Sequence, residues 1–166
     1  MKTITLIGMM GSGKSTIGKL LAQNLNCAFI DIDSLIEKNE NSKISEIFNK
    51  KGEAFFRKIE KETIKNNITC ENFVIATGGG AFEDKDTREL LLKISTVIYL
   101  KTSPKIILER LENDTSRPLL CGNMSVEKFS EIIEIRKQNY ESAPITITTD
   151  NKSPDQIISE ITGVLK

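Results

Sequence analysis

Five short runs of apolar and β-branched residues recur along the chain and predict five β-strands, at 3–7, 28–32, 73–77, 96–100 and 145–149. Between these runs the apolar spacing is that of amphipathic helices, as at 14–25 and 125–140. The runs are nearly continuous in Ile, Val and Leu, which is typical of parallel strands that are buried on both faces. This alternation predicts an α/β protein with a parallel sheet and helices on both of its faces.

Composition narrows the range of functions. The 166 residues are 39% hydrophobic and 28% charged, and no apolar run approaches the roughly 20 residues that a membrane helix needs. The 23 basic residues balance 23 acidic ones, which argues against a nucleic-acid-binding protein. The absence of histidine excludes imidazole catalysis and Ser-His-Asp triads. The three cysteines lack metal or redox spacing and no signal peptide is apparent, so we expect reduced thiols and a cytoplasmic protein.

The first predicted strand runs directly into a phosphate-binding motif. Residues 8–15 read GMMGSGKS and fit G-x-x-x-x-G-K-[ST] between a strand and a helix. The glycines let backbone N–H groups turn toward phosphate oxygens, and the N-terminus of the helix adds partial positive charge. Lys14 would reach the β- and γ-phosphates of a nucleoside triphosphate, and the Ser15 hydroxyl would bind Mg²⁺.

Two carboxylates, Asp31 and Asp33, close the second predicted strand. In extended chain, residues two apart face the same side, so both side chains would face the strand-end crevice where such sheets bind ligands. One carboxylate would help to hold Mg²⁺, and the other would accept the proton of an attacking hydroxyl. The alternative is that the pair caps a helix at 34–40.

Arginine is scarce, with five arginines against eighteen lysines, which favours roles that need a planar guanidinium. Arg136 lies on the apolar stripe of the helix at 125–140 and needs an anionic partner there. That partner is either a carboxylate substrate or a carboxylate of the chain itself. Arg57 is flanked by Glu53 and Glu60, which either orient it toward a ligand or pair with it on an exposed helix surface.

Further candidates follow in other loops. Arg117 lies in a polar loop that would close over a transferring phosphoryl group, unless it is an ordinary solvated arginine. Gly78, Gly79 and Gly80 follow the third strand and would let a ligand approach the backbone, with a flexible turn as the alternative. Arg110 lies one helix upstream of Arg117 and would face the nucleotide. Together these residues predict phosphoryl transfer from ATP to a hydroxyl of a small carboxylic acid.

The motifs resemble those of the shikimate kinase family. They are GMMGSGKST at 8–16, DID at 31–33, GEAFFRKIE at 52–60, TGGGA at 77–81, TSRPLL at 115–120 and RKQNY at 136–140. The resemblance implies one domain over 1–166 with a three-layer P-loop kinase fold, whose five-stranded parallel sheet has the order 2-3-1-4-5. It also implies transfer of the γ-phosphoryl group of ATP to the 3-hydroxyl of shikimate, with Mg²⁺ as cofactor, on the route to chorismate and the aromatic amino acids.

The resemblance also assigns roles to individual residues. ATP binding is implied for Gly11, Ser12, Gly13, Lys14, Ser15, Thr16, Arg110 and Arg117, with 150–154 beside the adenine. Metal binding is implied for Ser15 and Asp31, and shikimate binding for Asp33, Arg57, Gly79, Gly80 and Arg136. Catalysis is implied for Lys14, Asp33 and Arg117, with Asp33 activating the attacking hydroxyl. The moving parts would be a substrate-binding region at about 33–61 and a lid at about 112–124, in a monomer with no nucleic-acid or membrane partner.

Two other functions remain open at this point. One is a related kinase that acts on gluconate or on a nucleoside monophosphate, although Arg57 and Arg136 favour a compact carboxylate as acceptor. The other is a nucleotide-binding regulatory module without turnover. That module would be expected to lack a catalytic element, whereas Lys14, Asp33 and Arg117 are all present.

Overall fold

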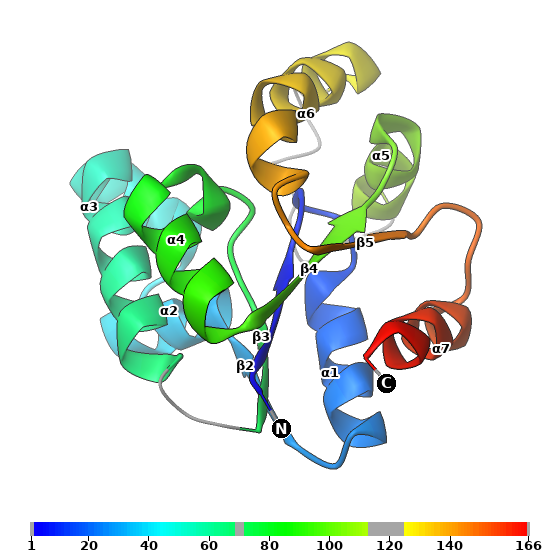
Figure 1. Ribbon diagram of the computed structural model, residues 1–166. Helices are drawn as coiled ribbons and strands as arrows, with labels where there is room; N and C mark the ends of the chain where they lie inside the picture. The colour runs from blue at the N-terminus through cyan, green and yellow to red at the C-terminus, as the bar shows by residue number, and fades with distance from the viewer. Residues whose placement is uncertain (1, 69–71, 113–124, 166) are drawn as a thin grey trace.

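The centre of the molecule is a parallel sheet of five strands in the order β2-β3-β1-β4-β5, which confirms the predicted fold class (Figure 1). The computed structural model describes residues 2–68, 72–112 and 125–165. The strands are β1 (Ile4–Ile7), β2 (Ala28–Asp31), β3 (Phe73–Ala76), β4 (Thr96–Lys101) and β5 (Ile145–Thr148). Each end lies within one residue of the predicted position.

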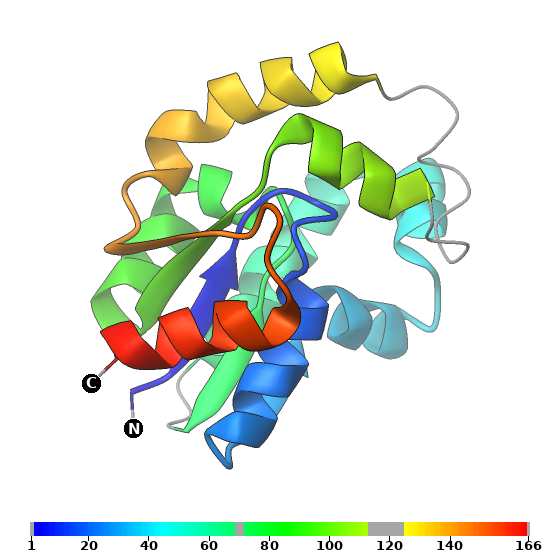
Figure 2. The ribbon, with the colours of Figure 1, turned by 90° about the vertical axis from the view of Figure 1, so that its right-hand side faces the viewer.

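Helices cover both faces of the sheet, as predicted (Figures 1 and 2). They are α1 (Lys14–Asn24), α2 (Ile32–Glu40), α3 (Ile44–Asn67), α4 (Lys85–Ile94), α5 (Pro104–Glu112), α6 (Val126–Tyr140) and α7 (Pro154–Val164), with a short 3₁₀ helix η1 (Ala81–Glu83). Helices α1 and α7 lie on one face and α2, α3 and α4 on the other, while α5 and α6 lie above the strand ends (Figure 1). Within the described ranges no helix is long and apolar enough to cross a membrane.

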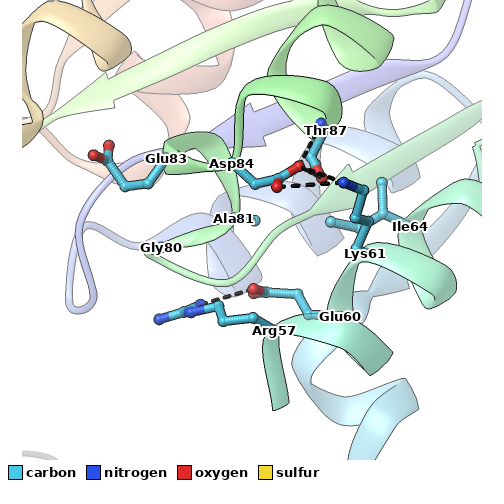
Figure 3. Close-up of a pocket in the computed structure, with 9 residues that line it drawn as sticks. All are labelled: Arg57, Glu60, Lys61, Ile64, Gly80, Ala81, Glu83, Asp84 and Thr87. Atoms are coloured by element: carbon cyan, nitrogen blue, oxygen red, sulfur yellow. Dashed lines mark hydrogen bonds and ion pairs between the residues drawn. The ribbon is translucent and has the colours of Figure 1, made fainter. Parts of the chain in front are cut away.

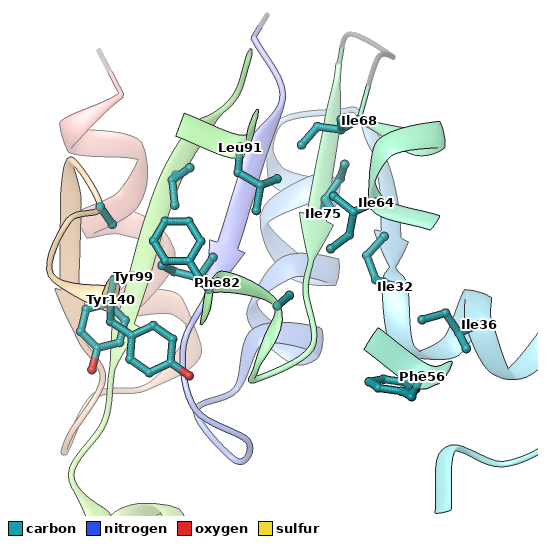
Figure 4. Packing of buried hydrophobic residues seen from close by; sticks show 14 of the residues in the cluster. Ile32, Ile36, Phe56, Ile64, Ile68, Ile75, Phe82, Leu91, Tyr99 and Tyr140 are labelled. Carbon is teal, nitrogen blue, oxygen red and sulfur yellow. The ribbon is translucent and has the colours of Figure 1, made fainter. Parts of the chain in front are cut away.

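Alternate side chains of each strand enter two different cores. Leu6 of β1 packs with Ile17 and Leu21 of α1, whereas Ile7 packs with the opposite core. That opposite core includes Ile75 of β3 and residues from α2, α3, α4 and α6 (Figure 4). Because both faces are buried, nearly every strand position is apolar, which explains the continuous runs in the sequence.

The strand order brings five loops to one edge of the sheet. β1 is central, and the chain moves from β1 outward to β2 and β3 on one side and to β4 and β5 on the other. The registers Leu6↔Ala76 and Leu6↔Ile98 keep the carboxyl ends of the central strands level. Ligands of open α/β sheets bind where the strand order reverses in this way, so the candidate residues after β1, β2 and β3 share one edge.

One local prediction was wrong. The second strand ends at Asp31, and α2 begins at Ile32 rather than at residue 34. Asp31 is the N-cap residue, because its carboxylate accepts a hydrogen bond of 3.0 Å from the Ser34 amide. Asp33 therefore lies in the first helical turn and does not share an extended segment with Asp31. The capping alternative is correct for Asp31, and the cap ends the strand because it satisfies the amides of the new helix.

Helix α3 is interrupted at Gly52, whose φ of 81° and ψ of 167° are not helical. Few residues other than glycine adopt such a positive φ, so the break is encoded at this position. The break separates the first part of α3, which packs on α2, from the part that carries Arg57.

Candidate active site

The phosphate-binding loop has the backbone that its motif requires. Gly11 and Gly13 have φ values of 75° and 94°, which favour glycine. Gly13 is the N-cap of α1 and makes no side-chain capping bond, so a bound phosphate can accept from the first amides of the helix. The Lys14 ammonium is buried and donates to the carbonyls of Gly8 at 2.8 Å and Met9 at 2.9 Å. The loop thus holds its lysine at the position where phosphate would bind.

Ser15 and Asp31 place two oxygen ligands beside this loop. The Ser15 hydroxyl donates to Oδ2 of Asp31 at 2.5 Å, while Oδ1 of the same carboxylate caps α2. A hydroxyl and a carboxylate are the hard oxygen donors that Mg²⁺ prefers. The described part of the chain contains no cluster of three or more His, Cys, Asp or Glu that could hold a metal ion. A divalent ion at this pair would therefore complete its shell with phosphate oxygens and water, as an ATP-bound ion does.

Arg110 joins the phosphate loop to the end of β5. Its Nη1 donates to the Ser12 carbonyl at 3.3 Å, and its Nη2 donates to the Thr149 carbonyl at 3.2 Å. The next residue, Asp150, accepts a bond of 2.9 Å from the Ser103 amide at the start of α5. Arg110 and the start of the segment 150–154 therefore lie close together beside the phosphate loop, and their place in an adenine pocket stays a prediction. Thr149 carries no sequence signal, because its contact with Arg110 depends on the neighbouring ends of β4 and β5.

Each glycine of the 78–80 triplet faces a different neighbour. A side chain on Gly78 would collide with the carboxylates of both Asp33 and Glu60, which lie over the same Cα. A Cβ on Gly79 would lie 3.1 Å from the Met10 amide nitrogen in the phosphate loop. The flexible-turn alternative does not account for these close approaches. The triplet is the surface on which the acidic residues and the phosphate loop meet.

Arg57 and Glu60 form an ion pair beside this triplet (Figure 3). Nη1 of Arg57 lies 2.7 Å from Oε2 of Glu60, and Nη2 lies 3.1 Å from Oε1 of Glu53. The Glu60 side chain is only 3% exposed, whereas that of Glu53 is 66% exposed, so the pair is more than a contact on the helix surface. Burial raises the pKa of the Glu60 carboxyl, and the nearby Arg57 guanidinium opposes that rise.

A cavity of about 310 Å³ lies between α3 and the segment that follows the triplet (Figure 3). It is lined by Arg57, Glu60, Lys61, Ile64, Gly80, Ala81, Glu83, Asp84 and Thr87. Lys61 bridges it with ion pairs to Asp84 at 3.2 Å and Asp86 at 2.7 Å. These contacts link α3 to the start of α4, and the sequence did not indicate them because the partners are more than twenty residues apart.

Arg136 approaches the same triplet from α6. Its Nη1 donates to the Gly79 carbonyl at 3.0 Å and contacts Sδ of Met9 at 3.7 Å. No carboxylate of the described residues forms an ion pair with Arg136, so the internal salt-bridge alternative has no support there. Arg57 and Arg136 instead contact the Gly79–Gly80 segment from α3 and α6. Arg117 and the predicted lid, apart from Glu112, lie outside the described residues.

A phosphate loop at the centre of a parallel sheet, with two arginines beside the Gly79–Gly80 segment at the same edge, is the arrangement of a P-loop kinase that acts on a small organic acid. The family model described as "Shikimate kinase" matches residues 10–166. The shikimate kinases of Sulfurihydrogenibium sp. (strain YO3AOP1) and Persephonella marina are each 45% identical over all 166 residues, which are 99% and 100% of those proteins. The chain belongs to the shikimate kinase family, and the function predicted from its motifs, that of a shikimate kinase, is confirmed.

A solved structure supports the same assignment. Shikimate kinase from Acinetobacter baumannii in complex with shikimate superposes with a TM-score of 0.93 at 34% identity, covering 99% of this chain and 93% of that one. Family membership over nearly the whole chain removes the gluconate, nucleoside monophosphate and regulatory alternatives.

Proposed function

We propose that the site described above binds ATP and shikimate side by side and transfers the γ-phosphoryl group to the 3-hydroxyl of shikimate. We further propose Mg²⁺ as the metal ion, a monomeric enzyme and a cytoplasmic location. The observation that carries the proposal is the approach of Arg57 and Arg136 to the Gly79–Gly80 segment from α3 and α6. Two guanidinium groups at the edge that also holds the phosphate loop suit a compact carboxylate acceptor.

On the nucleotide side, the phosphate loop from Gly11 to Thr16 would hold the phosphates. The Lys14 ammonium would exchange its carbonyl partners for β- and γ-phosphate oxygens. Ser15 and Asp31 would hold Mg²⁺, which neutralises charge on the same phosphates. Arg110 would line the nucleotide site through its contacts with Ser12 and Thr149.

On the acceptor side, Arg57 and Arg136 would bind the shikimate carboxylate, and Gly79 and Gly80 would let the ring approach the backbone. Asp33, which lies over Gly78, would bind the ring hydroxyls. The attacking oxygen forms a bond to the γ-phosphorus while the bond to the bridging oxygen of ADP breaks, and the hydroxyl proton passes to Asp33. Arg117 would reach the transferring group and stabilise its charge.

An acceptor panel tests this proposal. ADP release is measured with shikimate, gluconate and AMP in turn, and the product of the shikimate reaction is located by phosphorus NMR. We expect turnover with shikimate alone and phosphate on the 3-hydroxyl. Turnover with gluconate or AMP and none with shikimate would refute the proposal.

The role of Asp33 has its own test. The Asp33→Asn variant should still bind ATP, because the phosphate loop is untouched, but its kcat should fall by about 10²-fold or more. Full activity in that variant would remove Asp33 as the base and leave it as a binding residue only.

A further inference from the structure

The carbonyl oxygen of Gly79 differs from those of its two neighbours. The Gly78 carbonyl accepts a bond of 3.2 Å from the Ala81 amide, and the Gly80 carbonyl accepts one of 3.1 Å from the Glu83 amide. Both are local backbone hydrogen bonds within the turn. The Gly79 carbonyl instead accepts from two side chains of α6, the Nη1 of Arg136 at 3.0 Å and the hydroxyl of Tyr140. It is therefore the point at which α6 holds the glycine triplet.

Tyr140 is placed for this contact by the core beneath it. It is fully buried and stacks on Tyr99 of β4, with ring centroids 4.9 Å apart and ring planes inclined by 20° (Figure 4). Burial raises the pKa of the Tyr140 hydroxyl, so the group keeps its proton at neutral pH and acts as a donor. A buried ring that is stacked on a strand of the central sheet has little freedom to move, so the hydroxyl holds a fixed position.

Two donors on one carbonyl restrain a whole peptide group. A carbonyl oxygen has two lone pairs, and Arg136 and Tyr140 together use both of them. The peptide unit is planar, so fixing the Gly79 carbonyl also fixes the Gly80 amide, which points in the opposite direction. A Cβ added to Gly79 would meanwhile lie 3.1 Å from the Met10 amide nitrogen, so this glycine packs closely on the phosphate loop. The same segment is thus held from α6 and from the nucleotide side.

We propose that Tyr140 is a positioning residue for the acceptor site, because its hydroxyl and Arg136 share the Gly79 carbonyl and so hold the guanidinium and the Gly80 amide in one arrangement. The inference rests on the proposed function, in which Arg136, Gly79 and Gly80 bind shikimate. Tyr140 does not touch the reacting atoms. It acts through Arg136 and the Gly79–Gly80 segment, which would bind shikimate.

The variant Tyr140→Phe removes the hydroxyl and keeps the ring. Tyr99→Phe is a matched control, because it removes a hydroxyl from the same stacked pair, and the Tyr99 hydroxyl makes no hydrogen bond to a described residue. Loss of one hydrogen bond to the triplet should raise the KM for shikimate about 3- to 10-fold in Tyr140→Phe. The KM for ATP, and kcat, should change less than about twofold, because the phosphate loop and Asp33 are untouched.

The kinetic constants of the two variants show whether Tyr140 has a positioning role. A rise in the shikimate KM for Tyr140→Phe alone supports the positioning role, with thermal unfolding midpoints confirming that both variants are folded. An unchanged KM in Tyr140→Phe, an equal rise in both variants, or an equal rise for ATP and shikimate would overturn it. If Tyr140→Phe does not fold, 3-fluorotyrosine in place of tyrosine retains the ring and alters the strength of the hydroxyl as a donor, and an unchanged shikimate KM would again overturn the role. A wild-type chain that does not phosphorylate shikimate would refute the proposed function as well, whereas normal wild-type turnover confines any failure to Tyr140.

Discussion

Replacement of Gly80 by alanine should weaken shikimate binding without unfolding the protein. The backbone of Gly80, with φ of −105° and ψ of −4°, is open to residues other than glycine, so alanine adds no backbone strain. The new Cβ, however, would lie 2.6–2.7 Å from three atoms of the Arg57 guanidinium. That group is the end of a flexible side chain, so it will move rather than disrupt the fold.

The size of the effect follows from this movement. Ordinary van der Waals contact begins at 3.4 Å, so the guanidinium must withdraw by roughly 0.7 Å. Its bond of 2.7 Å to Glu60, and its contact with a bound carboxylate, cannot both survive such a shift. A hydrogen bond to a charged group contributes about 1.5–3 kcal/mol, so we expect the KM for shikimate to rise about 10- to 100-fold.

The assay is steady-state ADP release with shikimate varied at saturating ATP, together with thermal unfolding. Gly163→Ala serves as the control, because nothing lies within 4 Å of an added Cβ on that helical glycine. The control should leave both KM values unchanged and raise the stability of α7 by up to about 1 kcal/mol. A shikimate KM within twofold of wild type in Gly80→Ala would refute the placement of Arg57 at the acceptor site.

Two further predictions address the remaining charged groups. Arg136→Ala should raise the KM for shikimate, because the variant lacks a guanidinium that would bind the shikimate carboxylate and that has no ion pair among the described residues. The affinity for ATP should change little. Isothermal titration with each ligand checks this, and an unchanged affinity for shikimate would contradict it. Burial raises the pKa of the Glu60 carboxyl above its ordinary value of 4.5, so between pH 4.5 and that raised value the folded chain holds more of the proton than the unfolded chain does. The stability of the wild type relative to Glu60→Gln should therefore fall as pH rises from 4.5 through the raised value. A difference in unfolding free energy that does not vary with pH would refute this.

The strands and the phosphate loop could be predicted because their signals are local. A strand buried on both faces needs apolar residues throughout, and a phosphate loop needs glycine, lysine and serine at fixed spacing. The five strands are accordingly confirmed to within one residue, and the loop at 8–15 precedes α1 as expected. The resemblance to a known family supplied the strand order, which the apolar pattern alone does not contain.

The two aspartates at the end of β2 show where prediction from the local sequence was wrong. An extended segment from Asp31 to Asp33 has the same residue pattern as a strand that ends in an N-cap. The structure forms the cap, because the Asp31 carboxylate can satisfy the Ser34 amide and the Ser15 hydroxyl at once. The Ser15 contact spans sixteen residues and depends on α1 packing beside β2.

The order of residues along the chain thus determined the elements, the phosphate loop and the identity of the charged groups. Packing decided what those groups face. Gly78 lies under two carboxylates, Gly80 under a guanidinium, and the Gly79 carbonyl accepts from α6, although the three residues are chemically identical. Such differences arise only when α3, α6 and the phosphate loop converge on one edge of the sheet, because short-range polar contacts depend on distances that no single segment sets by itself.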